Sequence, residues 1–255
     1  MLLPPRMDDN MPLFDMHCHV DLMSSMTCFA KDAIVNDINI LAVTTTPKAF
    51  EKEHQQIGLL PNIRVALGIH PQLIADRFDE MNMFERYIST ARYIGEVGLD
   101  FHNRFYHSKD KQIEAFRIII SWCSKYSHKV ISIHSVWSDK NILDILEAYN
   151  GTQNNICILH WFSGSKLQLN RAIGLGCYFS VNSYMLNTPR GADIIKLIPA
   201  DRLTLESDAP FLSEISTIAD LKKVLTYVGQ QLILIKGNGI LQQIEETSKQ
   251  IFCGD

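Results

Sequence analysis

Six side chains that can bind metal ions each follow an apolar segment of the kind that forms a buried β-strand. They are His17, His19, Glu96, His134, His160 and Asp208. An imidazole or a carboxylate next to a strand core is costly to bury unless a partner, such as a metal ion, satisfies it. A single case could be a core histidine with an ordinary hydrogen-bond partner. The recurrence of this pattern along the chain predicts a metal centre.

The first two of these histidines have a spacing suited to one ion. His17 and His19 are two residues apart on a predicted strand, so their side chains leave the same face and can bind together, while Cys18 should face the other way. Asp208 could bind the same ion and orient or deprotonate a water molecule. This group is expected to form the first half of the centre.

Glu96 is the expected link to a second ion. It lies between Gly95 and the run Val97-Gly98-Leu99-Asp100, where small residues leave room for a bridging carboxylate. His134 and His160 are imidazole ligands suited to that second ion. Two divalent cations roughly 3.5 to 4 Å apart are the arrangement that splits phosphoesters. Glu96 and Asp208 are therefore the predicted catalytic residues.

These ligands need a scaffold that brings distant parts of the chain together. Short apolar runs predict strands over 14–20, 38–44, 64–69, 93–97, 129–134, 155–161, 177–181 and 202–206. Amphipathic stretches predict helices near 28–36, 48–58, 79–91, 108–127, 138–149, 165–174, 188–197, 217–235 and 240–252. Alternating strands and helices favour a parallel sheet, and eight repeats favour closure. We predict an α/β fold, a (β/α)8 TIM barrel with its site at the carboxyl ends of the strands.

Several helices begin with recognisable signals. Ser108 and Ser138 are suited to N-caps, and Thr188-Pro189 places proline at the first helical position. No linker or low-complexity tract divides the chain. We therefore expect one domain over residues 1–255, with 1–12 as a flexible lead-in.

Composition limits the class of protein. With 255 residues and 46% hydrophobic content the chain can bury one large core, and a formal charge of −4 argues against a long non-specific grip on duplex nucleic acid. The six cysteines show no C-x-x-C pair, so we expect reduced thiols. The start does not have the pattern of a signal peptide, and no apolar run reaches about 18 residues. A cytoplasmic protein without membrane contact is expected.

An ordered set of motifs resembles the TatD-type metal-dependent deoxyribonucleases. The matching blocks are Phe14 to His19 (FDMHCH), Gly68 to Pro71 (GIHP), Gly95 to Asp100 (GEVGLD), Gln112-x-x-Ala115-Phe116, Ile133 to Ser135 (IHS), His160 to Gly164 (HWFSG) and Glu206 to Pro210 (ESDAP). The resemblance implies an amidohydrolase-like barrel and a DNase that is supported by Mg2+ and often holds Zn2+; Mn2+ is also expected to serve. It assigns metal binding to the same six residues.

Four further residues are candidates for substrate contact. The resemblance places His70 near the cleft, where it would contact a substrate phosphate. His102 and Arg104 follow the fourth predicted strand, and Trp161 could stack on a base, as aromatic side chains do in single-strand sites. Each also has an ordinary interpretation: the first three as loop residues, and Trp161 as a ring packed under its own loop.

The sequence departs from the family pattern at three places. Gln72 stands where many members have a second histidine, and Val136-Trp137 replaces an arginine-containing continuation. After Leu212 the chain lacks the basic loop common in the family. This shortened region resembles that of the TatD-like members encoded with bacterial anti-phage Qat systems, the QatD-like branch, which implies association with other defence proteins.

Three functions follow as hypotheses. The first is a DNA phosphodiesterase that trims single-stranded or frayed ends as an exonuclease. The second is a metal-dependent hydrolase of carboxylic esters, lactones or amides on the same barrel. The third is a mainly structural subunit of a defence assembly. The first is preferred because the ligand set suits two-ion phosphoester chemistry.

Overall fold

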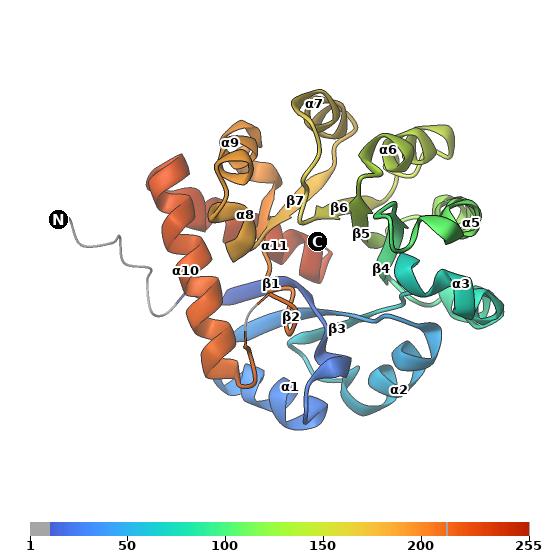
Figure 1. The fold of residues 1–255 in the computed structure, drawn as a ribbon. Helices are drawn as coiled ribbons and strands as arrows, with labels where there is room; N and C mark the ends of the chain where they lie inside the picture. Colours follow the sequence, from blue (N-terminus) through green and yellow to red (C-terminus); the bar gives the residue numbers. More distant parts are fainter. Residues whose placement is uncertain (1–10, 213, 255) are drawn as a thin grey trace.

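The protein is built from parallel strands that alternate with helices. The computed structural model describes residues 11–212 and 214–254, and all eight predicted strands are found there (Figure 1). They are β1 (Leu13–Cys18), β2 (Ile38–Val43), β3 (Ile63–Ala66), β4 (Tyr93–Asp100), β5 (Val130–Val136), β6 (Ile156–His160), β7 (Tyr178–Val181) and β8 (Leu203–Leu205). The expected lead-in, 1–12, falls mostly outside the described residues.

Helices form a ring around these strands (Figure 1). The α-helices are α1 (Met26–Val35), α2 (Pro47–Ile57), α3 (Ile74–Arg77), α4 (Met81–Ile88), α5 (Lys109–Lys125), α6 (Asp139–Ala148), α7 (Lys166–Gly174), α8 (Ser183–Leu186), α9 (Pro189–Leu197), α10 (Ile218–Lys236) and α11 (Ile240–Cys253). Short 3-10 helices are η1 (Val20–Leu22), η2 (Pro71–Leu73), η3 (Phe78–Glu80), η4 (Tyr106–Ser108) and η5 (Ala200–Arg202).

The strands form two parallel sheets that join at both edges. Strands β1 to β3 make one sheet and β4 to β8 the other, each in sequence order. Leu67 bridges to Ile94 at one junction. At the other, the Asp208 amide donates to the His17 carbonyl at 3.0 Å and the His19 amide donates to the Ala209 carbonyl at 2.9 Å. These bonds complete a TIM-barrel-like domain and confirm the predicted fold class.

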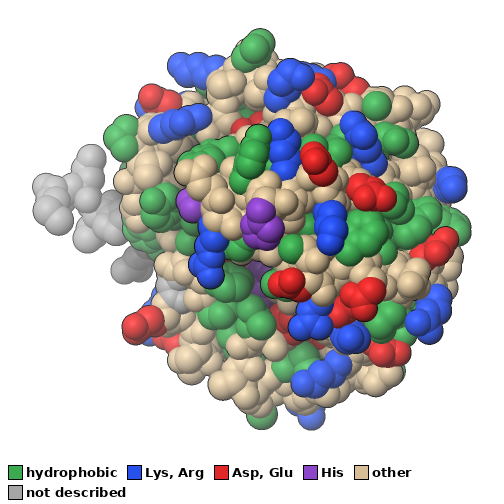
Figure 2. Space-filling model, turned by 45° about the vertical axis from the view of Figure 1, so that its right-hand side comes forward, with side chains coloured by type: hydrophobic (Ala, Val, Ile, Leu, Met, Phe, Trp, Pro, Cys, Tyr) green, Lys and Arg blue, Asp and Glu red, His purple; other side chains and the backbone are tan. Residues whose placement is uncertain are grey.

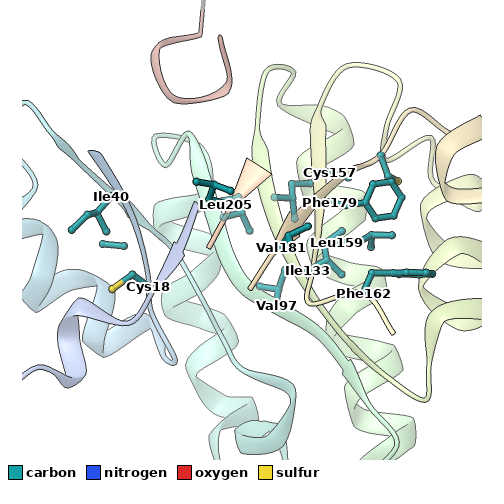
Figure 3. Close-up of a cluster of buried hydrophobic side chains, with 14 of the residues drawn as sticks. Cys18, Ile40, Val97, Ile133, Cys157, Leu159, Phe162, Phe179, Val181 and Leu205 are labelled. Atoms are coloured by element: carbon teal, nitrogen blue, oxygen red, sulfur yellow. The ribbon is translucent and has the colours of Figure 1, made fainter. Parts of the chain in front are cut away.

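Two apolar layers hold the barrel together. The inner layer contains Phe14 and Met16 of β1 and is covered at one end by Ile251 and Phe252 of α11. The outer layer lies between the strands and the surrounding helices; Figure 3 shows part of it, including Cys18, Ile133 and other labelled side chains. Each fully buried aliphatic or aromatic side chain of this kind stabilises the fold by about 1.5–3 kcal/mol. With α11 covering the opposite end, the carboxyl ends of the strands are left open for a site.

Irregular register in two strands turns polar residues into the barrel. In β1, Phe14 and Met16 face inward, yet Cys18 belongs to the outer layer, and the pairing with β2 shifts between Asp15 and Cys18. The pairing of β4 with β5 shifts in the same way between Ile94 and Val97. Such bulges re-aim the side chains that follow them. The expectation that Cys18 faces away from the histidines is confirmed.

Element boundaries differ from the predictions in several places. Strand β4 extends to Asp100, whereas the prediction ended at 97, and β1 ends at Cys18, whereas the prediction continued to 20. The predicted helix 79–91 is shorter, with η3 before it, and the short helices α3 and α8 were not predicted. Both are single turns of four residues, too short for a periodic apolar pattern to form.

Of the three predicted N-caps, the structure confirms one, whereas the other two side chains do not cap their helices. Thr188 caps α9 by accepting from the Gly191 amide, with Pro189 at the first position, as predicted. Ser108 and Ser138 occupy the N-cap positions of α5 and α6, but neither side chain caps its helix. Their hydroxyls donate to the carbonyls of Phe105 and Leu99. No helix within the described ranges combines the length and apolar character needed to cross a membrane.

Candidate metal centre

The structure brings the six predicted ligands together at the open end of the barrel. They reach this point from β1, β4, β5, β6 and the segment after β8. The expectation that each ligand lies just past a strand end holds for His19 and Asp208. It is corrected for the other four, which lie within their strands: His17, Glu96, His134 and His160. The inward turn produced by the irregular pairing of β4 places Glu96 in the barrel although the strand continues beyond it.

Glu96 lies at the middle of the centre, with its two oxygens facing different imidazoles. Its Oε2 atom is 3.5 Å from His17 Nε2 and 3.2 Å from His19 Nε2. Its Oε1 atom is 2.6 Å from His134 Nδ1 and 3.3 Å from His160 Nε2. One carboxylate therefore lies between two groups of nitrogen atoms, which is the geometry of a bridging ligand.

The first group consists of His17, His19 and Asp208. Asp208 Oδ1 lies 3.8 Å from His17 Nε2 and 3.7 Å from His19 Nε2. The three ligand atoms all fall within 4.8 Å of one another, and all three residues are buried. This spacing is suited to one divalent ion with His nitrogen and carboxylate oxygen ligands.

The second group includes a residue that the sequence assigned to substrate. His70 Nε2 lies 3.3 Å from Glu96 Oε1, so His70, Glu96 and His134 also form a cluster of potential ligands. Asp100 adds a carboxylate on the other side, 3.1 Å from His134 Nε2. The Gln72 amide donates to Asp100 at 2.8 Å. The glutamine that departs from the family pattern thus supports the carboxylate beside His134.

Buried polar residues behind the histidines hold the rings in place. Ser132 Oγ is 2.8 Å from His17 Nδ1, and Glu206 Oε2 is 3.4 Å from His160 Nδ1. Asp15 accepts from the His17 and Ser207 amides at 3.2 and 3.0 Å. Partners of this kind orient metal-binding imidazoles and select their tautomers. The sequence reasoning missed these roles, although polar residues inside apolar strands were a visible signal.

Burial and charge give the members of the centre different protonation states. Burial lowers the pKa of His17 to about 4, and the stacked ring of His160, 3.9 Å away between centroids, adds to the effect. Burial alone would raise the pKa of Glu96, but His70 and His17 bring it well below its usual range. His17 is therefore neutral and Glu96 ionised near pH 7, which are the forms that bind metal ions.

His134 and Asp208 are shifted in the opposite direction. Burial opposes protonation of His134, yet hydrogen bonds to Asp100 and Glu96 raise its pKa to about 9. Burial, reinforced by the Glu96 charge and opposed by His160, raises the pKa of Asp208 to about 7. A cation at either residue would favour the deprotonated form. Metal binding at this centre would therefore release protons.

An unsatisfied nitrogen atom at the centre supports the fit of these residues to a metal ion. His17 Nε2 is buried and has no hydrogen-bond partner among the described residues. His17 Nε2 instead faces oxygens of Glu96 and Asp208 at 3.5 and 3.8 Å. Since His17 is neutral with Nδ1 paired to Ser132, its Nε2 lone pair can point toward negative oxygens. A cation would turn this repulsion into coordination.

A cavity of about 420 Å³ opens over the centre. His70 and Trp161, two of the four predicted substrate residues, line it together with Gln72 and Val136. His102 and Arg104 are not among its lining residues: the His102 ring packs against Trp137 at 5.0 Å, and Arg104 lies over the ring of Phe105 at 5.4 Å. Among the described residues that line the cavity there is no lysine or arginine.

The face of the molecule seen in Figure 2 has no dominant charge. In Figure 2 the lysine and arginine side chains are interspersed with aspartates and glutamates over the face in view. This agrees with the formal charge of −4. Attraction of an anionic substrate would therefore depend on the centre itself rather than on a basic surface.

Comparison with known proteins agrees with the fold and with a metal-dependent hydrolase. The family described as TatD related DNase matches residues 14–253. A Buchnera aphidicola protein described as an uncharacterized metal-dependent hydrolase is 29% identical over 216 residues, 80% of each chain. An Erwinia amylovora protein described as a 3'-5' ssDNA/RNA exonuclease TatD is 25% identical over 197 residues, 71% of this chain and 73% of its own.

A solved structure of a TatD homologue from Escherichia coli shares the fold. It superimposes with a TM-score of 0.74 at 19% identity, covering 94% of this chain and 98% of its own. The family match extends over nearly the whole described chain and includes every residue of the centre. The chain belongs to the TatD family and is a metal-dependent hydrolase of the deoxyribonuclease type.

Proposed function

We propose that this protein hydrolyses phosphodiester bonds in DNA at a two-ion centre, acting as an exonuclease on single-stranded or frayed ends. The observation that carries the proposal is Glu96, whose two oxygens face two separate groups of imidazoles. The name of the Erwinia relative, a 3'-5' ssDNA/RNA exonuclease, supports the choice of nucleic acid.

The residues divide between two sites. His17, His19 and Asp208 would hold one ion. His134 and His160, whose ring nitrogens face the same Glu96 oxygen, would hold the other, with Glu96 between the two ions. Mg2+ or Mn2+ is proposed for activity, and Zn2+ also suits this ligand set. Two such ions would supply Lewis-acid stabilisation to the phosphate oxygens and the attacking water.

The chain's own side chains would position substrate and move the proton. Asp208 faces the cavity and carries the carboxylate best placed to accept a proton from water. His70 faces the same cavity from the other side of Glu96, where its Nε2–H could contact a phosphate oxygen. Burial of the centre excludes bulk water and strengthens these interactions.

The test uses metal-free protein reloaded with Mg2+, Mn2+ or Zn2+ and end-labelled single-stranded, duplex and frayed oligonucleotides. Cleavage should require metal and favour unpaired ends. Asp208→Asn should abolish it, while Asp193→Asn, an exposed carboxylate on α9, should not. Inactivity with all three ions, in protein shown to contain metal, would contradict the proposal.

One observation favours the ester or amide alternative: no described lining residue is a lysine or arginine that would select a phosphate. A panel of chromogenic phosphodiesters, esters and lactones separates the two, since turnover of carboxylic esters alone would exclude the nuclease. The structural-subunit hypothesis and the defence association stay predictions. Both are tested by asking whether Asp208→Asn abolishes a phage-resistance phenotype in cells.

A further inference from the structure

One wall of the cavity is aromatic. Trp161 follows β6, Tyr184 lies in α8 after β7, and Phe211 follows β8, so three consecutive strand-to-helix connections each contribute a ring to the cavity lining. The ring centroids of Trp161 and Tyr184 are 5.1 Å apart and tilted by 58°. Phe211 meets the ring of His19 edge-on at 5.1 Å. The aromatic wall, defined as these three residues, therefore borders the metal centre directly.

Two of these rings are largely exposed, unlike the aromatic residues beneath them, while Trp161 is half-buried and packs partly against the outer core. Tyr184 is 56% exposed and Phe211 is 62% exposed, whereas the adjacent Phe162 is 1% exposed and packs against Phe179 in the outer core. Single exposed apolar residues are common on proteins. Three rings that line one cavity form a concave apolar surface, which is typical of a ligand site.

The backbone holds one of these rings against its ordinary preference. Trp161 has a φ of 44°, in the left-handed region that bulky side chains rarely adopt. Residues held in this region cluster at ligand sites, where the surrounding structure maintains them. The placement of the indole on the cavity wall is thus maintained at a conformational cost.

The rest of the cavity lining has a different chemistry. It includes His70, Gln72 and Val136, and the described lining residues include no lysine or arginine. A phosphate would therefore be held by the ions and the imidazoles. Additional affinity for a nucleotide has to come from its base or sugar, and the aromatic wall is the surface available to them.

We propose that the aromatic wall binds one unpaired nucleobase of the nucleotide joined to the scissile phosphate. The inference rests on the proposed function and adds to it the element that recognises unpaired ends. A base within a duplex is stacked and paired, so its faces cannot reach Trp161 or Tyr184, whereas a frayed base can leave the stack. Stacking of this kind tolerates every base, so weak sequence preference is expected.

The test couples a protein ring to a base. Oligonucleotides carry a tetrahydrofuran abasic site at the terminal or the penultimate nucleotide, and kcat/KM is measured for wild type and Tyr184→Ala. On normal single strands the variant should lose about tenfold, in line with the stacking contribution of one base. On one of the two abasic substrates the same substitution should have no effect. This non-additivity would show that ring and base act together.

Two further variants act as controls. Tyr149→Ala removes a 37% exposed ring at the far end of α6 and should leave both substrates unchanged. Trp161→Phe retains an aromatic ring and should retain most of the activity, with full metal content. Equal effects of Tyr184→Ala on normal and both abasic substrates would overturn the inference while leaving the nuclease intact. Absence of cleavage by metal-loaded wild type would instead overturn the proposed function.

Discussion

Replacing Glu206 by glutamine should weaken metal binding without unfolding the protein. Glu206 is fully buried; its Oε1 accepts from Asn182 Nδ2 at 2.7 Å, and its Oε2 accepts from the Ser180 hydroxyl. Burial alone would raise its pKa, but His160 and Ser180 lower it below the usual range, so the carboxylate is ionised. As an anion 3.4 Å from His160 Nδ1, Glu206 attracts the His160 proton to that nitrogen through its charge, although the geometry of the pair is not that of a hydrogen bond.

Glutamine has the same shape as glutamate but reverses the preference for the His160 proton on Nδ1. Its carbonyl oxygen must face Asn182, because two amide NH2 groups would repel each other. The NH2 group then faces His160 Nδ1 and requires an acceptor there. The His160 proton moves to Nε2, the atom that faces Glu96 at 3.3 Å and would bind metal. Loss of such a supporting carboxylate typically lowers metal affinity by roughly 10- to 100-fold, or about 1.4 to 2.7 kcal/mol.

The assay is a Zn2+ titration of metal-free protein against a chromophoric chelator, with thermal melting to confirm folding. Glu80→Gln is the matched control, since Glu80 is another buried carboxylate but contacts Lys48 and Arg77, far from the centre. Activity of Glu206→Gln should be lost at limiting metal and recovered at high metal. A folded Glu206→Gln protein with unchanged affinity would refute the proposed link between Glu206 and the tautomer of His160.

Two other predictions concern stability and salt. Glu53 of α2 is fully buried with both oxygens unpartnered among the described residues, and burial, followed by the Asp21 charge, raises its pKa well above the usual value. Because the pKa is raised in the folded state, the wild type loses stability as pH rises from the unfolded-state pKa of Glu53 to its folded-state pKa. Urea melts at pH 5 and pH 8 should therefore show the free energy of unfolding of Glu53→Gln increasing relative to wild type by about 1.4 kcal/mol for each pH unit crossed between those two pKa values. An equal difference between the two proteins at both pH values would contradict this. Because no described cavity-lining residue is a lysine or arginine, KM for single strands should rise only weakly with salt, with a log–log slope near +0.7 per metal-held phosphate. A slope of several units would reveal a basic contact surface.

The sequence predicted the strands and the ligands because both leave local signals. Each strand is a short apolar run, and each ligand interrupts or ends one, as His134 does in β5. The convergence of the ligands then follows from the barrel, since parallel strands bring their carboxyl ends together. Positions within strands were less predictable. Glu96 faces inward because β4 is irregular between Ile94 and Val97, and such a bulge depends on pairing with a neighbouring strand.

Supporting residues and the cavity rim were harder to infer because they depend on three-dimensional neighbours. The substrate role of His70 stays a prediction, but the sequence did not indicate that its Nε2 lies 3.3 Å from the same Glu96 oxygen that His160 approaches. Asp100 and Gln72 form a chain behind His134 that no spacing in the sequence indicates. These contacts join residues that are distant in the sequence, so no local sequence pattern indicates them.

The metal centre and the aromatic wall come from different parts of the fold. The residues that determine the reaction are therefore distinct from those that determine which substrate binds. Five imidazoles lie within 3.5 Å of the Glu96 oxygens; these are His17, His19, His70, His134 and His160. A buried imidazole nitrogen that faces carboxylate oxygens without a hydrogen-bond partner, as His17 Nε2 does among the described residues, is costly unless a cation lies between them, which is a physical reason for metal dependence. Most of these ligands come from strands, so the reaction is tied to the barrel. The aromatic wall comes from loops, which tolerate sequence change. Sequence changes in the aromatic wall, or at Val136 at the end of β5, can therefore alter which substrates enter while the metal chemistry stays the same.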